Sequence, residues 1–232
     1  MKLRLLSQPS WRISINLTKW SGKLGVPLAS SLQTVCCVIV IGDGIPEDIV
    51  CLILAHKFNG GATVGITKPQ IEWASAVTEI IGRTRVGTVA LTIDQDDIRL
   101  DELWDRIENR LEEHAVSYEK DIEEERFRVY SCRHGQYSFK FPVVVNGLNK
   151  PYRKHTIEDH LLEASKGVLG DEELREAIKG IEDPKEAWRK LKDKHCKVYS
   201  HLCRAETNLI AQTFPQHVKF FKFIGRHSIE IP

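Results

Sequence analysis

Acidic side chains follow two apolar runs of the sequence closely enough to form one site. The first run, from Thr34 to Asp48, reads TVCCVIVIGDGIPED, and the second, from Arg85 to Asp97, reads RVGTVALTIDQDD. Both are largely β-branched and stop at Gly and acidic residues, as strands buried on both faces of a parallel sheet do. Loops at the carboxyl ends of such strands line the crevice where ligands bind. We therefore expect these acidic residues at one opening: Asp43, Glu47, Asp94, Asp96 and Asp97.

Carboxylates gathered at one opening repel one another unless a cation joins them, and a hard divalent cation is the usual partner. Asp94 and Asp96 can reach a single ion, because a loop just past a strand frees side chains from the alternation of the strand. We predict Mg²⁺ or Mn²⁺ as the cofactor, since an ion held in this way neutralises phosphoryl oxygens and orients a water for phosphodiester chemistry. The plainer alternative is that Asp94 to Asp97 only end a strand and cap the next helix.

The elements needed to position these residues alternate regularly along the chain. The pattern predicts strands over 35–41, 62–66 and 86–93, and helices from Pro46 to Gly60, from Pro69 to Gly82 and from Leu100 to His114. Strands that alternate with helices predict a parallel sheet with right-handed crossovers. The fold class expected is therefore α/β.

The remainder of the chain predicts a sheet extension and then helices. Residues 127–132 and 137–145 flank His134-Gly135 and indicate a hairpin, or a fourth strand with an extra edge strand. Helices are expected from 155 to 170, over 171–179 and from 184 to about 212, and the tail 218–231 is expected as a strand or a docking arm. We divide the chain into an N-terminal extension (1–33), an α/β domain (34–168) and a helical C-terminal extension (169–232).

The order of these elements, together with two short motifs, resembles the Toprim domain of topoisomerases, bacterial-type primases and OLD-family nucleases. The motifs are IEDHLL at 157–162 and KHCKVYSHL at 194–202. They are similar to motifs of small Toprim-like proteins found in archaea and bacteria, and the resemblance spans roughly Val35 to Leu202. It implies a Rossmann-like, mostly parallel sheet of about four strands flanked by helices. It also implies nuclease-like chemistry on a nucleic acid, with Mg²⁺ at Asp94 and Asp96 and with Glu158 and Asp159 as further acidic ligands.

One position departs from the Toprim pattern, which places a glutamate between the first strand and a glycine. This chain has Ile41 there, ahead of Gly42. Asp43 and Glu47 are then the candidates for the general acid/base role. A basic loop beside the expected acidic opening supplies Lys150 and Arg153 as candidate phosphate ligands.

Composition limits the alternatives. With 33 basic and 32 acidic residues the formal charge is +1, so binding of a nucleic acid must come from local patches. No apolar run is long enough to span a bilayer, and we expect a cytoplasmic protein without a membrane partner. The six cysteines form no CxxC pair, and Cys36, Cys37 and Cys51, which lie inside apolar runs, are expected as buried thiols. The single Met and the Lys/Glu-rich helices indicate a thermophile.

Two other functions stay open at this point. The first is a catalytically inactive Toprim-like binding or regulatory module, which Ile41 favours. The second is a nucleotide-sensing Rossmann-like domain that forms a homodimer through its C-terminal helices. The partner in each case is a nucleic acid or a nucleotide, and the sequence does not distinguish DNA from RNA.

Overall fold

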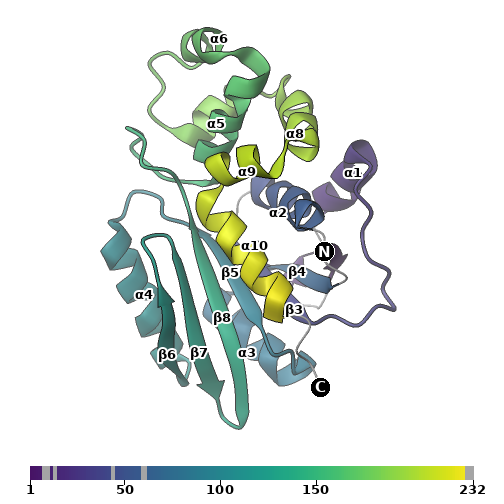
Figure 1. Ribbon diagram of the computed structural model, residues 1–232. Coiled ribbons are helices and arrows are strands. Elements are labelled where there is room, and N and C mark those ends of the chain that lie inside the picture. Colours follow the sequence, from purple (N-terminus) through teal and green to yellow (C-terminus); the bar gives the residue numbers. More distant parts are fainter. Residues whose placement is uncertain (7–10, 13–14, 43–44, 59–61, 228–232) are drawn as a thin grey trace.

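A computed structural model describes residues 1–6, 11–12, 15–42, 45–58 and 62–227 of the chain (Figure 1). Seven of its strands form one sheet in the order β1-β4-β3-β5-β8-β7-β6, and the short β2 pairs with β4. The strands are β1 (Lys2–Leu5), β2 (Trp11–Arg12), β3 (Cys37–Ile41), β4 (Thr63–Pro69), β5 (Val89–Asp94), β6 (Val116–Glu123), β7 (Phe127–His134) and β8 (Tyr137–Asn146).

The centre of the sheet is parallel, as the alternation of strands and helices predicts. Strands β1, β4, β3, β5 and β8 run in one direction, and β7 and β6 continue the sheet antiparallel. In the register of these strands Ile41 lies opposite Thr92, and Asp94 lies opposite Asn146. The carboxyl ends of β3, β5 and β8 therefore meet at one edge of the sheet.

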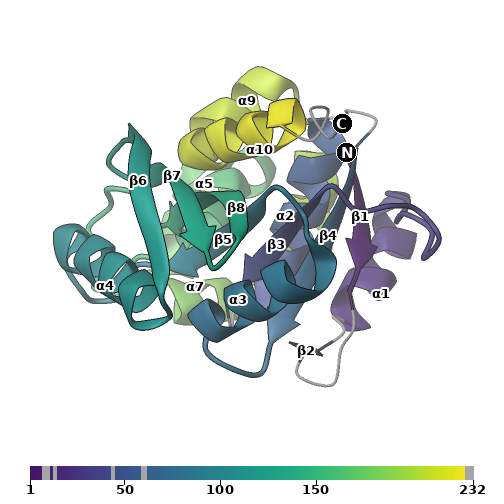
Figure 2. The same cartoon turned by 90° about the horizontal axis from the view of Figure 1, so that it is seen from below.

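Helices cover both faces of the sheet (Figure 2). On one face, α3 (Trp73–Thr84) and α4 (Leu100–Glu113) pack against Val38, Val40 and neighbouring side chains. On the other face, Ile39 and Ile41 join a larger core with residues of α1, α2, α5, α7, α8, α9 and α10. These helices are α1 (Ile15–Leu24), α2 (Ile45–Lys57), α5 (Ile157–Leu169), α6 (Asp171–Ala177), α7 (Pro184–Lys190), α8 (His195–Arg204), α9 (Thr207–Thr213) and α10 (Pro215–His227).

The sheet is larger than the four strands expected. The strand β1 adds a parallel edge next to β4, and the charged strand β6 adds an antiparallel edge next to β7. Most of β6 is exposed and its pairing shifts between Lys120 and Ile122, so it lacks the regular apolar alternation that marks a strand in sequence. Both additions lie outside the α/β alternation on which the expectation was based.

Three expectations for single elements were wrong. Pro69 does not begin a helix but ends β4, because β2 pairs with Lys68 and Pro69 and extends that strand, and α3 begins only at Trp73. The single helix expected from 184 to 212 is three helices, α7, α8 and α9. The described part of the tail, up to His227, is a helix rather than a strand, since Val218, Phe221 and Ile224 are buried at a spacing of three residues, and residues 228–231 of that expectation lie outside the described residues.

The helices after residue 168 share their core with the sheet. Trp188, Tyr199 and Phe220 belong to the same hydrophobic cluster as Ile39 and Ile41. None of the helices in the described ranges is both long and apolar enough to cross a membrane.

Candidate functional site: an acidic cleft with a basic rim

A cleft of about 1210 Å³ opens at the carboxyl ends of β3 and β5. It is bounded by the connection from β4 to α3, by the loop after β5, by α4, and by α7 with the start of α8. Six acidic residues line it, and they come from segments far apart in the chain: Glu47, Glu72, Asp94, Asp96, Asp97 and Glu158. The sequence predicted this convergence for Glu47, Asp94, Asp96 and Asp97. The Toprim resemblance supplied Glu158, and Glu72 was not predicted.

Glu47 lies in the first turn of α2 and is only 2% exposed. The Thr92 hydroxyl donates a hydrogen bond to its Oε1, and Asn146 Nδ2 donates to the same oxygen at 2.7 Å. A Cβ placed on Gly42 would lie 3.4 Å from Glu47 Oε2, so the carboxyl group sits beside the end of β3. Burial raises the pKa of Glu47 to about 8, and the neighbouring charge of Asp94 contributes to the increase. Glu47 therefore holds a proton near neutral pH.

Asp94 is held by two donors at the end of β5. Asn146 Nδ2 donates to Asp94 Oδ1 at 2.9 Å, and the Ile157 N–H at the start of α5 donates to the same oxygen at 3.1 Å. The same amide nitrogen of Asn146 thus donates to Glu47 Oε1 and to Asp94 Oδ1, so these two carboxyl groups lie next to each other. The amino end of α5 also favours negative charge at this point.

Lys185 of α7 brings a cation to the acidic cluster. Its Nζ lies 3.0 Å from Asp94 Oδ2 and 3.5 Å from Asp96 Oδ1. Partial burial lowers the pKa of Lys185, but the charges of Asp94 and Asp96 outweigh burial and raise this pKa above its ordinary value. The ammonium group therefore balances part of the charge of the carboxylates in the absence of any ion.

Glu158 and Asp96 complete the acidic wall. Glu158 is 5% exposed, and its buried Oε2 has no hydrogen-bond partner within the described residues. Burial raises the pKa of Glu158, and the charge of Asp94 raises it further. Asp96 has a positive φ of 56° and exchanges two backbone hydrogen bonds of 2.9 Å with His155. This bridge fixes the loop after β5 against the segment that leads into α5.

Basic and aromatic side chains surround the acidic wall. Arg110 of α4 pairs with Glu72 at 3.3 Å across the cleft wall, while Arg189 and Lys192 are exposed around the end of α7. Trp73 stacks on Phe141 at 5.9 Å between ring centroids, and Trp188 stacks on His195 at 3.8 Å. The basic residues that line the cleft are Lys68, Arg106, Arg110, Lys185, Arg189 and Lys192.

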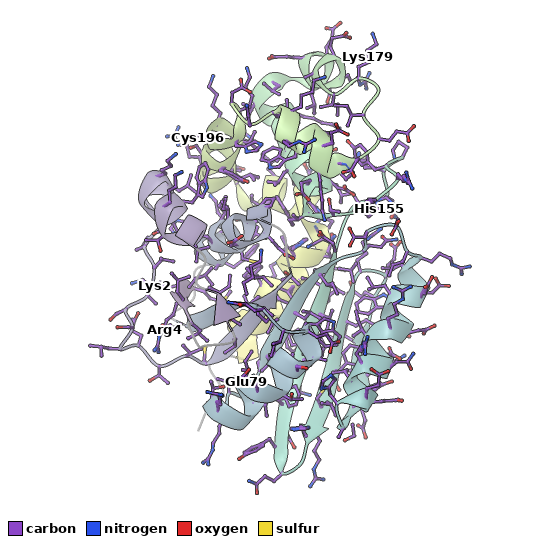
Figure 3. The ribbon with its side chains drawn as sticks, turned by 180° about the vertical axis from the view of Figure 1, so that it is seen from behind. Lys2, Arg4, Glu79, His155, Lys179 and Cys196 are labelled. Carbon is purple, nitrogen blue, oxygen red and sulfur yellow. The ribbon has the colours of Figure 1, made fainter. Side chains whose placement is uncertain are left out.

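The structure places the other predicted site residues differently. Asp43 lies outside the described residues. Lys150 pairs with Glu163 at 3.1 Å, and the Arg153 N–H donates to Glu182 O at 3.3 Å. Neither Lys150 nor Arg153 is among the residues that line the cleft. Figure 3 shows His155, of the same connection between β8 and α5, between the strands and the C-terminal helices.

Asp159 makes the contacts of a helix cap. It is 1% exposed, and its carboxylate accepts hydrogen bonds from the Leu148 N–H at 3.0 Å and the Thr156 N–H at 3.5 Å. His155 Nδ1 lies 3.1 Å from the same carboxylate. Asp159 is not among the cleft-lining residues, because its side chain is turned to the loop before α5.

The donor set of the cleft suits a hard cation. Carboxylate oxygens are the ligands that Mg²⁺ and Mn²⁺ prefer, the partnerless Glu158 oxygen is available, and the Lys185 ammonium already occupies a cationic position between Asp94 and Asp96. In the described ranges, however, no group of three or more His, Cys, Asp or Glu side chains lies close enough together to hold a metal ion. In the cleft, Lys185 stands between the carboxylates. An ion would therefore have to displace Lys185.

Comparison with family models, with curated proteins and with solved structures finds no match for this chain. Among the side chains that contact Glu47 or Asp94, the sequence reasoning missed Thr92, Asn146 and Lys185. Asn146 had a usable signal, because it ends the apolar run of β8 as Asp94 ends that of β5. Lys185 lies in a segment rich in lysine and glutamate, where nothing in the sequence distinguishes it from its neighbours.

Proposed function

We propose that the cleft binds Mg²⁺ or Mn²⁺ and a phosphodiester of a nucleic acid, as in a Toprim-like nuclease. The observation that carries this proposal is the meeting of Glu47, Asp94, Asp96 and Glu158 at one end of a parallel sheet, under a rim of basic side chains. Carboxylates that hold a cation, next to cations that hold phosphate, are the arrangement that phosphodiester chemistry uses.

Asp94, Asp96 and Glu158 would hold the ion. When bound, it would neutralise charge on the phosphoryl oxygens and polarise a water molecule. In the Toprim pattern a glutamate directly before the glycine at position 42 acts as general acid/base, and this chain has Ile41 there. Glu47 would take over that role, since its carboxyl group lies beside Gly42 and holds a proton near neutral pH. Asn146 Nδ2 donates to both Glu47 and Asp94 and so holds the two carboxyl groups side by side.

Phosphate contacts would come from the rim. Lys185, once displaced from Asp94, is the cation nearest to the acidic wall. Arg189 of α7 and Lys192, just past the end of this helix, continue the positive charge. The volume of 1210 Å³ exceeds that of typical small-molecule pockets and suits several nucleotides. Aromatic walls such as Trp73 offer stacking surfaces for bases. The phosphate-binding roles proposed for Lys150 and Arg153 would require the substrate to extend beyond the cleft.

The test is the double variant Asp94→Ala/Asp96→Ala. We expect it to lose Mg²⁺ and Mn²⁺ binding in calorimetric titration and to lose nicking of single- and double-stranded DNA and RNA. The matched control is Asp171→Ala/Glu172→Ala, which removes two exposed acidic residues of α6 outside the cleft. Wild-type metal affinity and activity in the cleft variant would refute the proposal.

A catalytically inactive binding module is the second candidate. Ile41 is 1% exposed and lines the cleft where the Toprim pattern has its glutamate, and this observation favours the loss of catalysis. Metal-dependent binding of oligonucleotides without any cleavage would support this candidate. Binding of mononucleotides without metal would instead support a nucleotide-sensing domain. A homodimer and a cytoplasmic location stay predictions.

A further inference from the structure

A buried hydrogen-bond chain connects the last helix, α10, with the carboxylates of the cleft. His217 of α10 is 1% exposed, and its Nε2 lies 2.8 Å from Asn146 Oδ1. The amide nitrogen of the same Asn146 donates to Glu47 at 2.7 Å and to Asp94 at 2.9 Å. His217 therefore acts on the cleft through one intermediate side chain, although it does not line the cleft.

Only one arrangement of protons satisfies this chain. Asn146 must present its NH₂ group to the carboxyl oxygens of Glu47 and Asp94, because the opposite orientation would bring its carbonyl oxygen against both of them. Its carbonyl then needs a donor, and His217 Nε2–H supplies it. The Nδ1 atom of His217 has no hydrogen-bond partner within the described residues. A buried acceptor without a partner is tolerated better than a buried charged donor, so the imidazole is neutral.

The neighbouring contacts hold the His217 ring in place. It packs edge-on against His160 at 4.8 Å and against Phe214 at 5.6 Å between ring centroids. Gln216 Nε2 donates to Val145 O at 3.2 Å and to Gly147 O at 2.9 Å, on either side of Asn146. The first turn of α10 therefore forms hydrogen bonds both to the backbone at the end of β8 and to the side chain of Asn146, the last residue of that strand.

His160 provides an internal comparison. It is equally buried and lies in the same cluster, but its Nδ1 donates to the Thr213 carbonyl at 2.7 Å and its Nε2 accepts from the Gly147 N–H at 3.2 Å. Its bonds to the strand end are to the backbone rather than to a side chain of the cleft. Of these two imidazoles, only His217 contacts the Asn146 amide.

We propose that His217 is a positioning residue of the cleft, whose Nε2–H fixes the Asn146 amide so that one NH₂ group holds Glu47 and Asp94 together. The C-terminal helix is then part of the functional site and not only a cover for the sheet. This inference deepens the proposed function and rests on it only for the metal-binding measurement described below.

The first test uses the wild-type protein. Long-range ¹H–¹⁵N correlation spectra of the histidine side chains report which ring nitrogen carries the proton. We expect His217 to carry it on Nε2 and His160 on Nδ1. A proton on His217 Nδ1, or a doubly protonated ring at neutral pH, would overturn the proposal without the use of any variant.

The second test compares His217→Phe, which keeps a ring but removes the donor, with His217→Gln, which keeps an N–H donor at similar reach. We expect solvent exchange of the Asn146 NH₂ protons to accelerate roughly tenfold in His217→Phe, as the loss of one buried hydrogen bond predicts, and to stay close to wild type in His217→Gln. Mn²⁺ affinity should weaken in the same order.

His160→Phe is the matched control and should change neither measurement as much as His217→Phe does. Equal effects of His160→Phe and His217→Phe would show general loosening of α10 and refute a positioning role, as would unchanged exchange in His217→Phe. If the wild-type protein binds no metal but the exchange rates follow the expected order, the proposed function fails and the positioning role of His217 stands.

Discussion

The protonated state of Glu47 makes a measurable prediction about stability. Folding raises its pKa from 4.5 to about 8, so between these values the folded protein binds one more proton than the unfolded chain. Stability contributed by this group is therefore present below pH 4.5 and is lost as the pH rises towards 8. Glu47→Gln has the shape of the protonated side chain, and its carbonyl oxygen can accept the same hydrogen bonds from Thr92 and Asn146. The variant should not suffer this loss.

The size of the effect follows from the shift in pKa. Each unit of pKa corresponds to about 1.4 kcal/mol, so the increase for Glu47 corresponds to about 4 to 5 kcal/mol over the whole interval. The free energy of unfolding of Glu47→Gln, minus that of the wild type, should therefore be near its minimum below pH 4.5. It should then increase by about 1.4 kcal/mol for each pH unit until pH 8.

Urea unfolding at half-unit pH steps from 4 to 9, with EDTA in every buffer, measures this difference. The subtraction removes the contributions of all other titrating groups that the two proteins share. Glu119→Gln, at an exposed position of β6, is the matched control and should stay parallel to the wild type. A difference between Glu47→Gln and wild type that does not change between pH 5 and 8 would refute the assignment of a buried proton to Glu47.

Three further variants test the rest of the site. Lys185→Met leaves Asp94 and Asp96 without their counter-ion. In EDTA it should lower the free energy of unfolding by about 1 kcal/mol, since the ion pair is partly exposed, and Mg²⁺ should restore the loss. Unchanged thermal unfolding would contradict the ion pair. Arg189→Glu/Lys192→Glu should weaken oligonucleotide binding and reduce its salt dependence by about two phosphate contacts, measured by fluorescence anisotropy, whereas an unchanged salt slope would remove both residues from the interface. Asp159→Ala should lower stability by about 1 kcal/mol through loss of the α5 cap. The Mg²⁺ affinity of this variant distinguishes a helix cap from a metal ligand. It should stay unchanged if Asp159 only caps α5, and it should fall if Asp159 binds the ion.

The part of the site that lies on the parallel sheet could be predicted from sequence. Asp94 ends an apolar strand, and Glu47 follows another by a short turn, so topology alone brings their side chains to one edge. Glu158 came from a motif and not from the topology. The same reasoning failed for Lys150 and Arg153, because closeness in sequence to the acidic segment of α5 does not place the loop before this helix at the cleft.

The contribution of the C-terminal third could not be predicted in this way. Lys185 and His217 reach the site only because α7 and α10 pack back onto the sheet through Trp188, Phe220 and Phe221. That packing depends on contacts between residues far apart in the chain, and no local pattern encodes them. The tail was expected as a strand or a docking arm and not as a helix, since its run of apolar residues is compatible with either periodicity over a short window.

Groups of the protein itself offset the negative charge of the cleft, which explains how several acidic residues can lie close together there without a metal ion. A proton on Glu47, the Lys185 ammonium and the amide groups at the start of α5 and on Asn146 each offset part of the charge. Binding of a divalent cation next to Asp94 should expel Lys185 and release the proton of Glu47, because both balance the same carboxylates, and Glu47 would then act as the base in the proposed chemistry. Metal affinity should therefore increase with pH up to about 8, with about one proton released per ion, which calorimetry in buffers of different ionisation enthalpy would measure. Binding without proton release would show that the ion does not reach the Glu47–Asp94 pair and would separate the metal site from the buried end of the cleft.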